Sequence, residues 1–344
     1  MSIELLNHNN LGSLTEILYL LKNVLSDEPM PLMDIKKYCS DRSIDFNYSI
    51  DGIISLLEFI GILYISDGAA KRLFNLDKTL RGKNHETCFR EKLVHRLFLR
   101  LRETSQLGSF FPLDKIKYDT VVNAITIHNS SISMKYSGLK NFLINIDFLS
   151  PSTILSNVLI VDSVFEPFME DKVVPWLIEN AQDEIRSGKK LSSIQFQELQ
   201  KLKEEYGSDA EEYVLNYERR RLSGHRNIDS TKIISKLDIF AGYDIVSFET
   251  LESTNLDRFI EVKSFSKTLE FFWSKNEVEV SKMKGMRYYL YLVDRDAIDN
   301  PYYEPIIVQN PYIKIYIHPD WRKDAQNWLI KYNRFQRGDS SAIC

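Results

Sequence analysis

Apolar positions in the first 75 residues follow the period of an α-helix in two places. Leucine and isoleucine recur every three or four residues over 14–25 and again over 50–57, and a shorter helix is expected between them around Leu32. The turn Ser66-Asp67-Gly68 then separates two short strand-like runs, which predicts a β-hairpin. Three helices followed by a hairpin is the order of a winged helix, so we interpret residues 1–80 as a winged-helix-like domain.

The charged residues of this predicted domain partly oppose and partly favour DNA binding. A winged helix reads DNA with its recognition helix, but here that helix would expose Asp51, Ser55 and Glu58. Acidic side chains repel phosphate, and only Lys71 and Arg72 on the hairpin favour it. Two interpretations therefore stay open, a DNA-binding module and a scaffold for protein contacts.

The pattern weakens over residues 81–190. We expect a basic helix from Phe89 to Glu103, in which Arg96 and Arg100 share a face and are candidates for contact with a nucleic-acid backbone. A solvated amphipathic face is the alternative interpretation of the same charges. We describe 81–190 as a mainly helical middle region.

Two further features of that region are predicted. Residues 131–149 have helical spacing, and residues 154–162 read as a strand. One hypothesis is a second, degenerate winged helix between about 85 and 165.

From Leu191 the pattern sharpens into an α/β order, and we assign residues 191–344 to one C-terminal domain with a mixed central sheet. The expected elements are helices at 192–204 and 209–222, strands at 236–249, 258–265 and 268–274, a helix at 276–286, a strand at 288–293, and a terminal strand and helix at 312–317 and 320–335. The aromatic side chains of this domain, Trp273, Tyr288, Tyr289 and Tyr291, have the spacing of core residues. The whole chain is therefore expected to be a multidomain α+β protein.

Composition narrows the class of protein. Of 344 residues, 44% are hydrophobic and 27% charged, with a net charge of −4, which is an ordinary globular balance. Contact with nucleic acid would have to come from local basic patches. Three widely spaced cysteines predict neither a disulfide framework nor a zinc site. With no signal-peptide pattern and no membrane-spanning apolar run, we expect a cytoplasmic protein without a membrane contact.

The candidate chemistry lies in Asp244 and, 17 positions later, Glu261-Val262-Lys263. Residues i and i+2 of a strand share a face, so Glu261 and Lys263 project together, and Asp244 joins them if the two strands pair. Side-by-side carboxylates repel unless a cation lies between them, which suggests Mg²⁺, or Mn²⁺ in its place, with the Val262 carbonyl as a further ligand. The alternative is a Glu–Lys pair on the exposed face of a strand.

The order of several segments resembles a known family. From about Leu191 to Val308 the chain resembles the NO VEIN C-terminal-type domain, a branch of the PD-(D/E)XK nuclease superfamily. The segments that carry the resemblance are AEEYVLNYERRRL, GYDIVSF, RFIEVK, FFWSKNEVEVS and YYLYLV. It implies a four-stranded mixed sheet flanked by helices, with Asp244, Glu261 and Lys263 as the catalytic core.

The resemblance also implies accessory residues. Glu218 matches an upstream glutamate that often completes the metal shell, and Asn276 and Glu277 match polar positions near the substrate. Tyr243 stands where the superfamily motif has proline, a position that varies among its members. Glu277 has an alternative interpretation as a first-turn residue favoured by the helix dipole.

Basic residues next to Glu218 give two further interpretations. Arg219, Arg220 and Arg226 can form a phosphate-facing rim or a solvated face. Glu218 itself can pair with Arg219 or Arg221 on its own helix.

Together these features predict a Mg²⁺-dependent DNA endonuclease that hydrolyses phosphodiester bonds in double-stranded DNA. The resemblance implies a restriction or anti-phage defence effector that works with partner proteins. Cutting both strands needs two active sites, so we expect a homodimer or larger assembly. The alternatives are a non-catalytic module that binds nucleic acid or protein, and a winged-helix transcriptional regulator.

Overall fold

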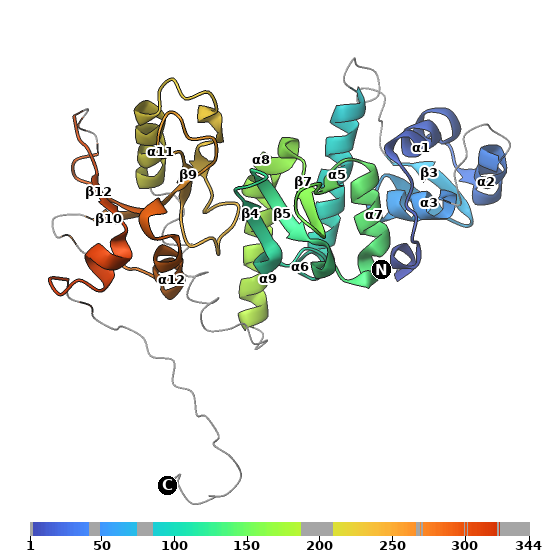
Figure 1. Cartoon of the computed structure of the whole chain (residues 1–344). Coiled ribbons are helices and arrows are strands. Elements are labelled where there is room, and N and C mark those ends of the chain that lie inside the picture. Colours follow the sequence, from blue (N-terminus) through green and yellow to red (C-terminus); the bar gives the residue numbers. More distant parts are fainter. Residues whose placement is uncertain are drawn as a thin grey trace, which may run out of the picture.

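The computed structural model describes residues 3–40, 49–73, 85–186, 209–265, 269, 271–298, 300, 302–321 and 323. These residues form three units that lie in a row, with the N-terminal unit at one end and the C-terminal unit at the other (Figure 1). Each unit has its own sheet, of three, four and five strands respectively. The described part of the chain is therefore a mixed α/β structure with several sheets.

The N-terminal unit contains the predicted helices and hairpin. Its elements are η1 (Ile3–Asn7), α1 (Leu14–Tyr19), a π-helical turn (Leu20–Val24), β1 (Met30–Pro31), α2 (Leu32–Ser40), α3 (Ile50–Phe59), β2 (Leu63–Ser66) and β3 (Ala69–Arg72). Asp67 and Gly68 have φ of 52° and 73°, as the tight turn of a hairpin requires. The short strand β1, which the sequence did not predict, completes an antiparallel sheet of order β1-β3-β2.

The middle unit is less helical than expected. Its elements are α5 (His85–Glu103), α6 (Leu107–Phe110), β4 (Ile116–Asp119), β5 (Ala124–His128), α7 (Ser137–Asn145), β6 (Leu149–Pro151), β7 (Val158–Val161), α8 (Glu166–Phe168) and α9 (Val174–Arg186). Four strands form an antiparallel sheet of order β4-β5-β7-β6, where the sequence predicted one strand. The element order also differs from that of the N-terminal unit, where three helices precede the hairpin.

Strand β5 was not predicted because it is short and buried on both faces. In β5 the four residues from Ala124 to Ile127 are all buried, so no alternation of polar and apolar positions marks the strand. The predicted helix over 131–149 is helical in its centre, as α7, and then gives way to β6.

The C-terminal unit has a five-stranded mixed sheet of order β12-β11-β10-β9-β8. Its elements are α11 (Asp209–Arg221), β8 (Lys232–Ile233), β9 (Ile245–Ser247), β10 (Arg258–Phe265), α12 (Lys275–Lys284), β11 (Tyr288–Asp294), β12 (Ile306–Gln309) and a π-helical turn (Tyr312–Tyr316). Strands β10 and β11 are parallel, and the other neighbours are antiparallel. The sheet is mixed, as expected, but has a fifth strand, β8, of two residues.

Three strand predictions in this unit were wrong or too long. Only Ile245–Ser247 of the predicted strand 236–249 is a strand, because the residues before it form turns around Asp238 and Gly242. The second prediction, a strand at 268–274, was wrong, because its described residues 269 and 271–274 have no regular structure. The segment 312–317 is a helical turn in which the rings of Tyr312 and Tyr316 stack at 5.4 Å. The predicted helix 192–204, and most of that at 320–335, lie outside the described residues.

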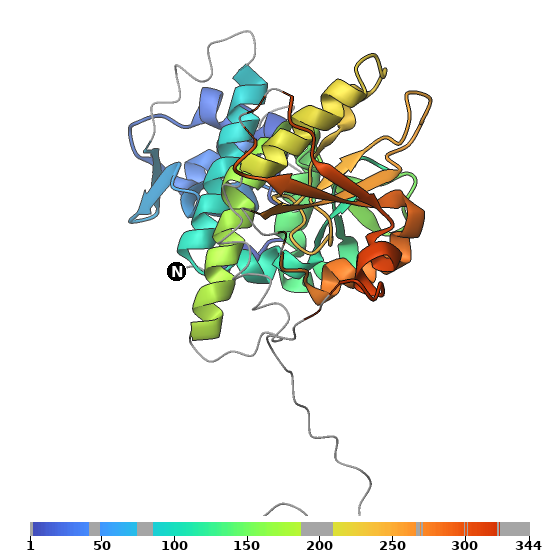
Figure 2. The same cartoon turned by 90° about the vertical axis from the view of Figure 1, so that its left-hand side faces the viewer.

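Helices α11 and α12 lie on opposite sides of the five-stranded sheet (Figures 1 and 2). Ile260 and Val262 of β10 pack in one apolar cluster with Val214 of α11, while Phe259 belongs to a different cluster. Because successive side chains of a strand alternate, Glu261 and Lys263 lie on the α12 side with Phe259. In the described part of the chain no helix has the length and apolar character needed to cross a membrane.

Candidate functional site

Strand β10 presents Glu261 and Lys263 together on the face of the sheet that α12 covers. Both side chains are buried, with relative exposures of 1% and 4%. The ammonium of Lys263 lies 2.6 Å from Oε1 of Glu261 and 3.2 Å from Oε2 of Glu277. The predicted E-x-K pair is therefore a buried ion pair, and the alternative of an exposed Glu–Lys pair was wrong.

Asp244 lies beside this pair, at the point where β9 begins. Its N–H donates to the Ile260 carbonyl at 2.8 Å, and its Oδ2 accepts from the Val262 N–H at 2.7 Å. In an extended strand the C=O of a residue points to the same side as its N–H, so the Val262 carbonyl also faces Asp244. The structure thus brings together the three predicted core residues and the predicted backbone ligand.

The loop before Asp244 is held close to α12. Gly242 has a φ of 72°, and a Cβ at this position would lie 2.7 Å from Cγ2 of Val280. Asn276, predicted to lie near the substrate, donates from Nδ2 to the Phe240 carbonyl at 3.0 Å. Its side chain therefore anchors the loop that leads to Asp244.

Glu277 belongs to the same cluster as Lys263. It is the third residue of α12 and forms a capping box with Ser274, which donates to and accepts from it. Its carboxylate also reaches Lys263 from the first turn of the helix. Glu277 therefore caps α12 and also lies beside Lys263, while its predicted place near the substrate stays a prediction.

Tyr288, predicted only as a core aromatic, is a part of the site that sequence reasoning missed. Its hydroxyl donates to the Gly242 carbonyl at 2.7 Å and lies 3.4 Å from Oε2 of Glu261. Burial raises the pKa of Tyr288 well above its usual value, and the charges of Glu261, Glu277 and Asp244 raise it further. The negative charges of three carboxylates therefore act on one buried phenol.

The donor chemistry of this cluster fits a hard divalent cation. Asp244, Glu261 and Glu277 carry three negative charges against one positive charge on Lys263, and two of the four side chains are almost fully buried. Carboxylate and carbonyl oxygens are the ligands that Mg²⁺ prefers. Within the described ranges, no group of three or more His, Cys, Asp or Glu side chains is arranged as a ready metal site.

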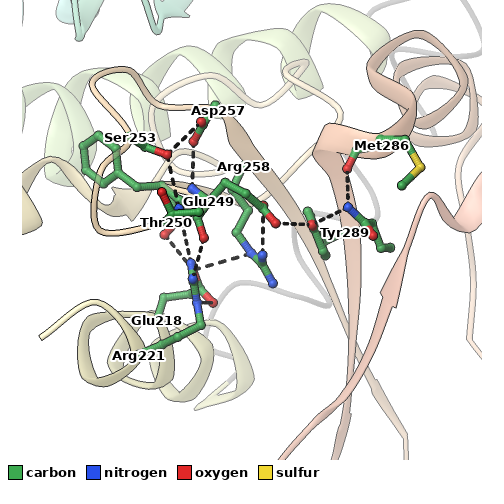
Figure 3. A network of polar contacts seen from close by, with 12 residues as sticks. Glu218, Arg221, Glu249, Thr250, Ser253, Asp257, Arg258, Met286 and Tyr289 are labelled. Atoms are coloured by element: carbon green, nitrogen blue, oxygen red, sulfur yellow. Dashed lines mark hydrogen bonds and ion pairs between the residues drawn. The ribbon is translucent and has the colours of Figure 1, made fainter. Parts of the chain in front are cut away.

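Glu218 lies on the other face of the sheet. Its carboxylate accepts from Arg221 at 2.9 and 2.6 Å (Figure 3). It also accepts from Ser247 and Tyr291 at 2.6 Å each. These partners belong to the α11 side, where Arg258 also lies, 3.7 Å away. The predicted pairing with Arg221 is formed, and Glu218 does not join Asp244, Glu261 and Lys263.

Glu218 is charged and well compensated. Burial raises its pKa, but the hydrogen bonds from Arg221 and the charges of Arg258 and Arg221 lower it more, so the net pKa is below its usual value. Arg258 in turn stacks on Tyr289 at 3.6 Å and pairs with Glu249 (Figure 3). This network joins α11 to β9, β10 and β11.

The predicted arginine rim lies on or near α11. All three arginines are exposed, and Arg219 also donates to the Thr231 carbonyl at 3.3 Å. Helix α11 covers one face of the five-stranded sheet, whereas Glu261 and Glu277 lie on the other face. The structure therefore does not bring Arg219 and Arg220 to the candidate site.

The basic residues of helix α5 are engaged within the protein. Arg96 donates to the Ile60 carbonyl at 3.3 Å, and Arg100 donates to the Phe59 carbonyl at 3.0 Å and to Glu103. These carbonyls end helix α3, where cationic partners are favourable. Both arginines therefore join the middle unit to the N-terminal unit.

The two predicted basic residues of the hairpin differ. Arg72 is 13% exposed and is held by Asp27 and by the Leu21 carbonyl. Lys71 lies 5.7 Å from the centre of the Tyr64 ring. Of this pair, Arg72 has a structural role in the N-terminal unit.

One comparison with known proteins gives a match. Residues 210–306 match the family described as "Protein NO VEIN, C-terminal". The match covers α11, the candidate site and β11, and it agrees with the resemblance found in the sequence. No curated protein and no solved structure matches the chain.

Proposed function

We propose that the C-terminal unit is a metal-dependent nuclease domain of the PD-(D/E)XK type that hydrolyses phosphodiester bonds. The observation that carries this proposal is the grouping of Asp244, next to the start of β9, with Glu261 and Lys263 on the adjacent strand β10. Asp244 accepts from the Val262 N–H at 2.7 Å, and Lys263 lies 2.6 Å from Glu261. A mixed sheet between two helices and the family match support it.

Each residue of this group would have a distinct role. Asp244, Glu261 and the Val262 carbonyl would hold the cation through hard oxygen atoms. Mg²⁺, or Mn²⁺ in its place, would polarise the phosphate and lower the pKa of a bound water. Lys263 would orient that water and stabilise the negative charge that develops on the phosphate.

Glu277 is better suited to positioning than to substrate contact. A carboxylate repels a phosphate, whereas its Oε2 lies 3.2 Å from the Lys263 ammonium. We infer that Glu277 holds Lys263 beside the cation ligands. The capping box supports this role. It joins the Glu277 side chain to Ser274 at the start of α12 and so fixes the position of the carboxylate.

The proposed substrate is double-stranded DNA, and the N-terminal unit is proposed to be a winged helix. The element order α1-β1-α2-α3-β2-β3 and the sheet order β1-β3-β2 support this assignment. A role as a restriction or anti-phage defence effector in the cytoplasm, acting as a homodimer or with partner proteins, would follow from cutting both strands of foreign DNA.

A second candidate function is a non-catalytic binding module. The observation that favours it is burial, because Glu261 and Lys263 are 1% and 4% exposed and pair with each other. In such a module the ion pair would stabilise the sheet, and the cluster would need no cation.

Cleavage of plasmid DNA with Mg²⁺ or Mn²⁺ distinguishes the two functions. Wild-type protein should nick or cut, and EDTA should abolish the reaction. Asp244→Asn and Lys263→Met should abolish it as well, while Lys275→Met, at an exposed position of α12, should leave it unchanged. DNA binding without metal-dependent cutting, equal in all variants, would establish the binding module instead.

A further inference from the structure

A buried carboxylate, Asp238, makes one of the contacts that attach the loop carrying Asp244 to the middle unit. This side chain is 5% exposed and lies between β8 and β9. Its Oδ2 accepts from the backbone N–H of Tyr118 at 3.1 Å, and its Oδ1 lies 3.3 Å from Nζ of Lys117. Both partners belong to β4 of the middle unit.

Asp238 also organises its own loop. Its Oδ1 accepts from the Phe240 N–H at 3.1 Å, and its backbone N–H donates to the Ile234 carbonyl at 2.8 Å. The Ile234 N–H in turn donates to the Asp244 carbonyl at 2.6 Å. A continuous chain of hydrogen bonds therefore runs from β4 through Asp238 to Asp244.

Two other anchors hold the same loop, and both come from within the C-terminal unit. Asn276 of α12 donates to the Phe240 carbonyl, and Tyr288 of β11 donates to the Gly242 carbonyl. Other anchors come from the middle unit, where Lys117 lies 5.2 Å from the centre of the Phe240 ring and Glu170 lies 3.4 Å from Lys236. The loop is thus shaped by two units of the protein together.

Separating the units would change the loop for a simple energetic reason. A buried carboxylate is costly unless it is paired and hydrogen-bonded, and β4 supplies a backbone N–H and an ammonium to Asp238. Burial raises the pKa of Asp238, while Lys117 and the N–H groups of Tyr118 and Phe240 oppose that shift. Without β4, Asp238 would turn toward water and release the Phe240 turn.

We propose that Asp238 is a positioning residue through which strand β4 of the middle unit holds Asp244 in place for cation binding. The role in cation binding rests on the nuclease function proposed above. The coupling between β4 and the loop does not depend on it. The middle unit then contributes to the site, because Asp244 keeps its position only while β4 contacts Asp238.

The test uses the full-length protein and three variants. Asp238→Asn keeps the size of the side chain but has one acceptor oxygen in place of two. Lys117→Met removes the ammonium and leaves Asp238 and the Tyr118 N–H intact. Glu170→Gln is the matched control, because it removes the Glu170–Lys236 ion pair (3.4 Å) between the same two units without a bond to the backbone of the loop.

Hydrogen exchange and Mn²⁺ titration are the two readouts. Exchange of the N–H groups of residues 234–244 and of Val262, whose N–H is bonded to Asp244, should quicken about tenfold in Asp238→Asn. The Kd for Mn²⁺ should rise about tenfold, and cleavage lost at low Mn²⁺ should return at high Mn²⁺. Lys117→Met should show a smaller change in the same direction, and Glu170→Gln should match the wild type.

The outcomes separate the two proposals. Unchanged exchange in both Asp238→Asn and Lys117→Met would overturn the coupling, whether or not the protein cuts DNA. Faster exchange in a protein whose wild type neither binds Mn²⁺ nor cuts would keep the coupling and reject the nuclease function. Faster exchange with an unchanged Kd for Mn²⁺ would show that Asp238 shapes the loop without positioning a cation ligand.

Discussion

Glu218 and Glu261 are both buried glutamates of the C-terminal unit, yet they face opposite sides of its sheet. Glu218 pairs with Arg221 on the α11 side, and Glu261 pairs with Lys263 on the α12 side. The sheet therefore separates two polar clusters. One is balanced by arginines, while the named side chains of the other carry an excess of negative charge. We expect mutations in the two clusters to have different consequences.

Replacing Glu218 should destabilise the protein without weakening cation binding. In Glu218→Ala the guanidinium of Arg258, which is 7% exposed, loses a buried carboxylate partner. Removing one member of a buried pair costs about 3–5 kcal/mol, measured as the free energy of unfolding in urea. Glu212→Ala, at an exposed position of the same helix, should change it by less than about 0.5 kcal/mol. A weaker affinity for Mn²⁺ with unchanged stability would place Glu218 at the cation site instead.

Glu218 should also make the protein sensitive to acid. Its folded pKa lies below its unfolded value of 4.5, so its charge stabilises the folded state at pH values above 4.5. That stabilisation is lost as the pH falls through the folded pKa, because the carboxylate must then be protonated. We therefore expect the free energy of unfolding of the wild type to fall more steeply below pH 4.5 than that of Glu218→Gln. Parallel curves for the two proteins would contradict this assignment.

The sequence predicted that Glu261 and Lys263 share a face of the sheet, but it did not predict which face Glu218 reaches. The alternation of side chains on β10 is a local property, so the shared face of Glu261 and Lys263 followed from their spacing. The side of the sheet on which α11 packs depends on tertiary structure. The helical spacing of Glu218 and Arg221 indicated their pairing, but it could not show which face Glu218 would reach.

Tyr288 and Asp238 show what local patterns leave out. Tyr288 sits in an apolar run and has the pattern of a core residue, and only its place opposite Phe259 in the parallel register brings its hydroxyl to Glu261. Asp238 contacts Tyr118, which is 120 positions away in the sequence. Contacts of this kind have no periodic signature.

Lys263→Met should lower the stability of the protein and make that stability depend on divalent ions. Lys263 is 4% exposed, and its loss leaves the buried Glu261 and the partly buried Glu277 without the ammonium. We expect a loss of about 3 kcal/mol in the free energy of unfolding. Mg²⁺ should restore part of it, because an ion that binds only the folded state stabilises it by mass action. Thermal melts with Mg²⁺ and with EDTA measure both effects, and a melt that is insensitive to the ion would argue against a cation site.

Arg100 should be needed for the attachment of the N-terminal unit and not for nucleic-acid binding. Its guanidinium donates to the Phe59 carbonyl at the end of α3, next to the Arg96 contact with Ile60. Arg100→Ala should therefore cost about 1 kcal/mol in the free energy of unfolding and quicken hydrogen exchange in α3. Its affinity for DNA, and the dependence of that affinity on salt, should stay at wild-type values. A phosphate contact would instead reduce the slope of log K against log salt by about one. Lys92→Ala, at an exposed position of the same helix, serves as the control for the loss of one charge.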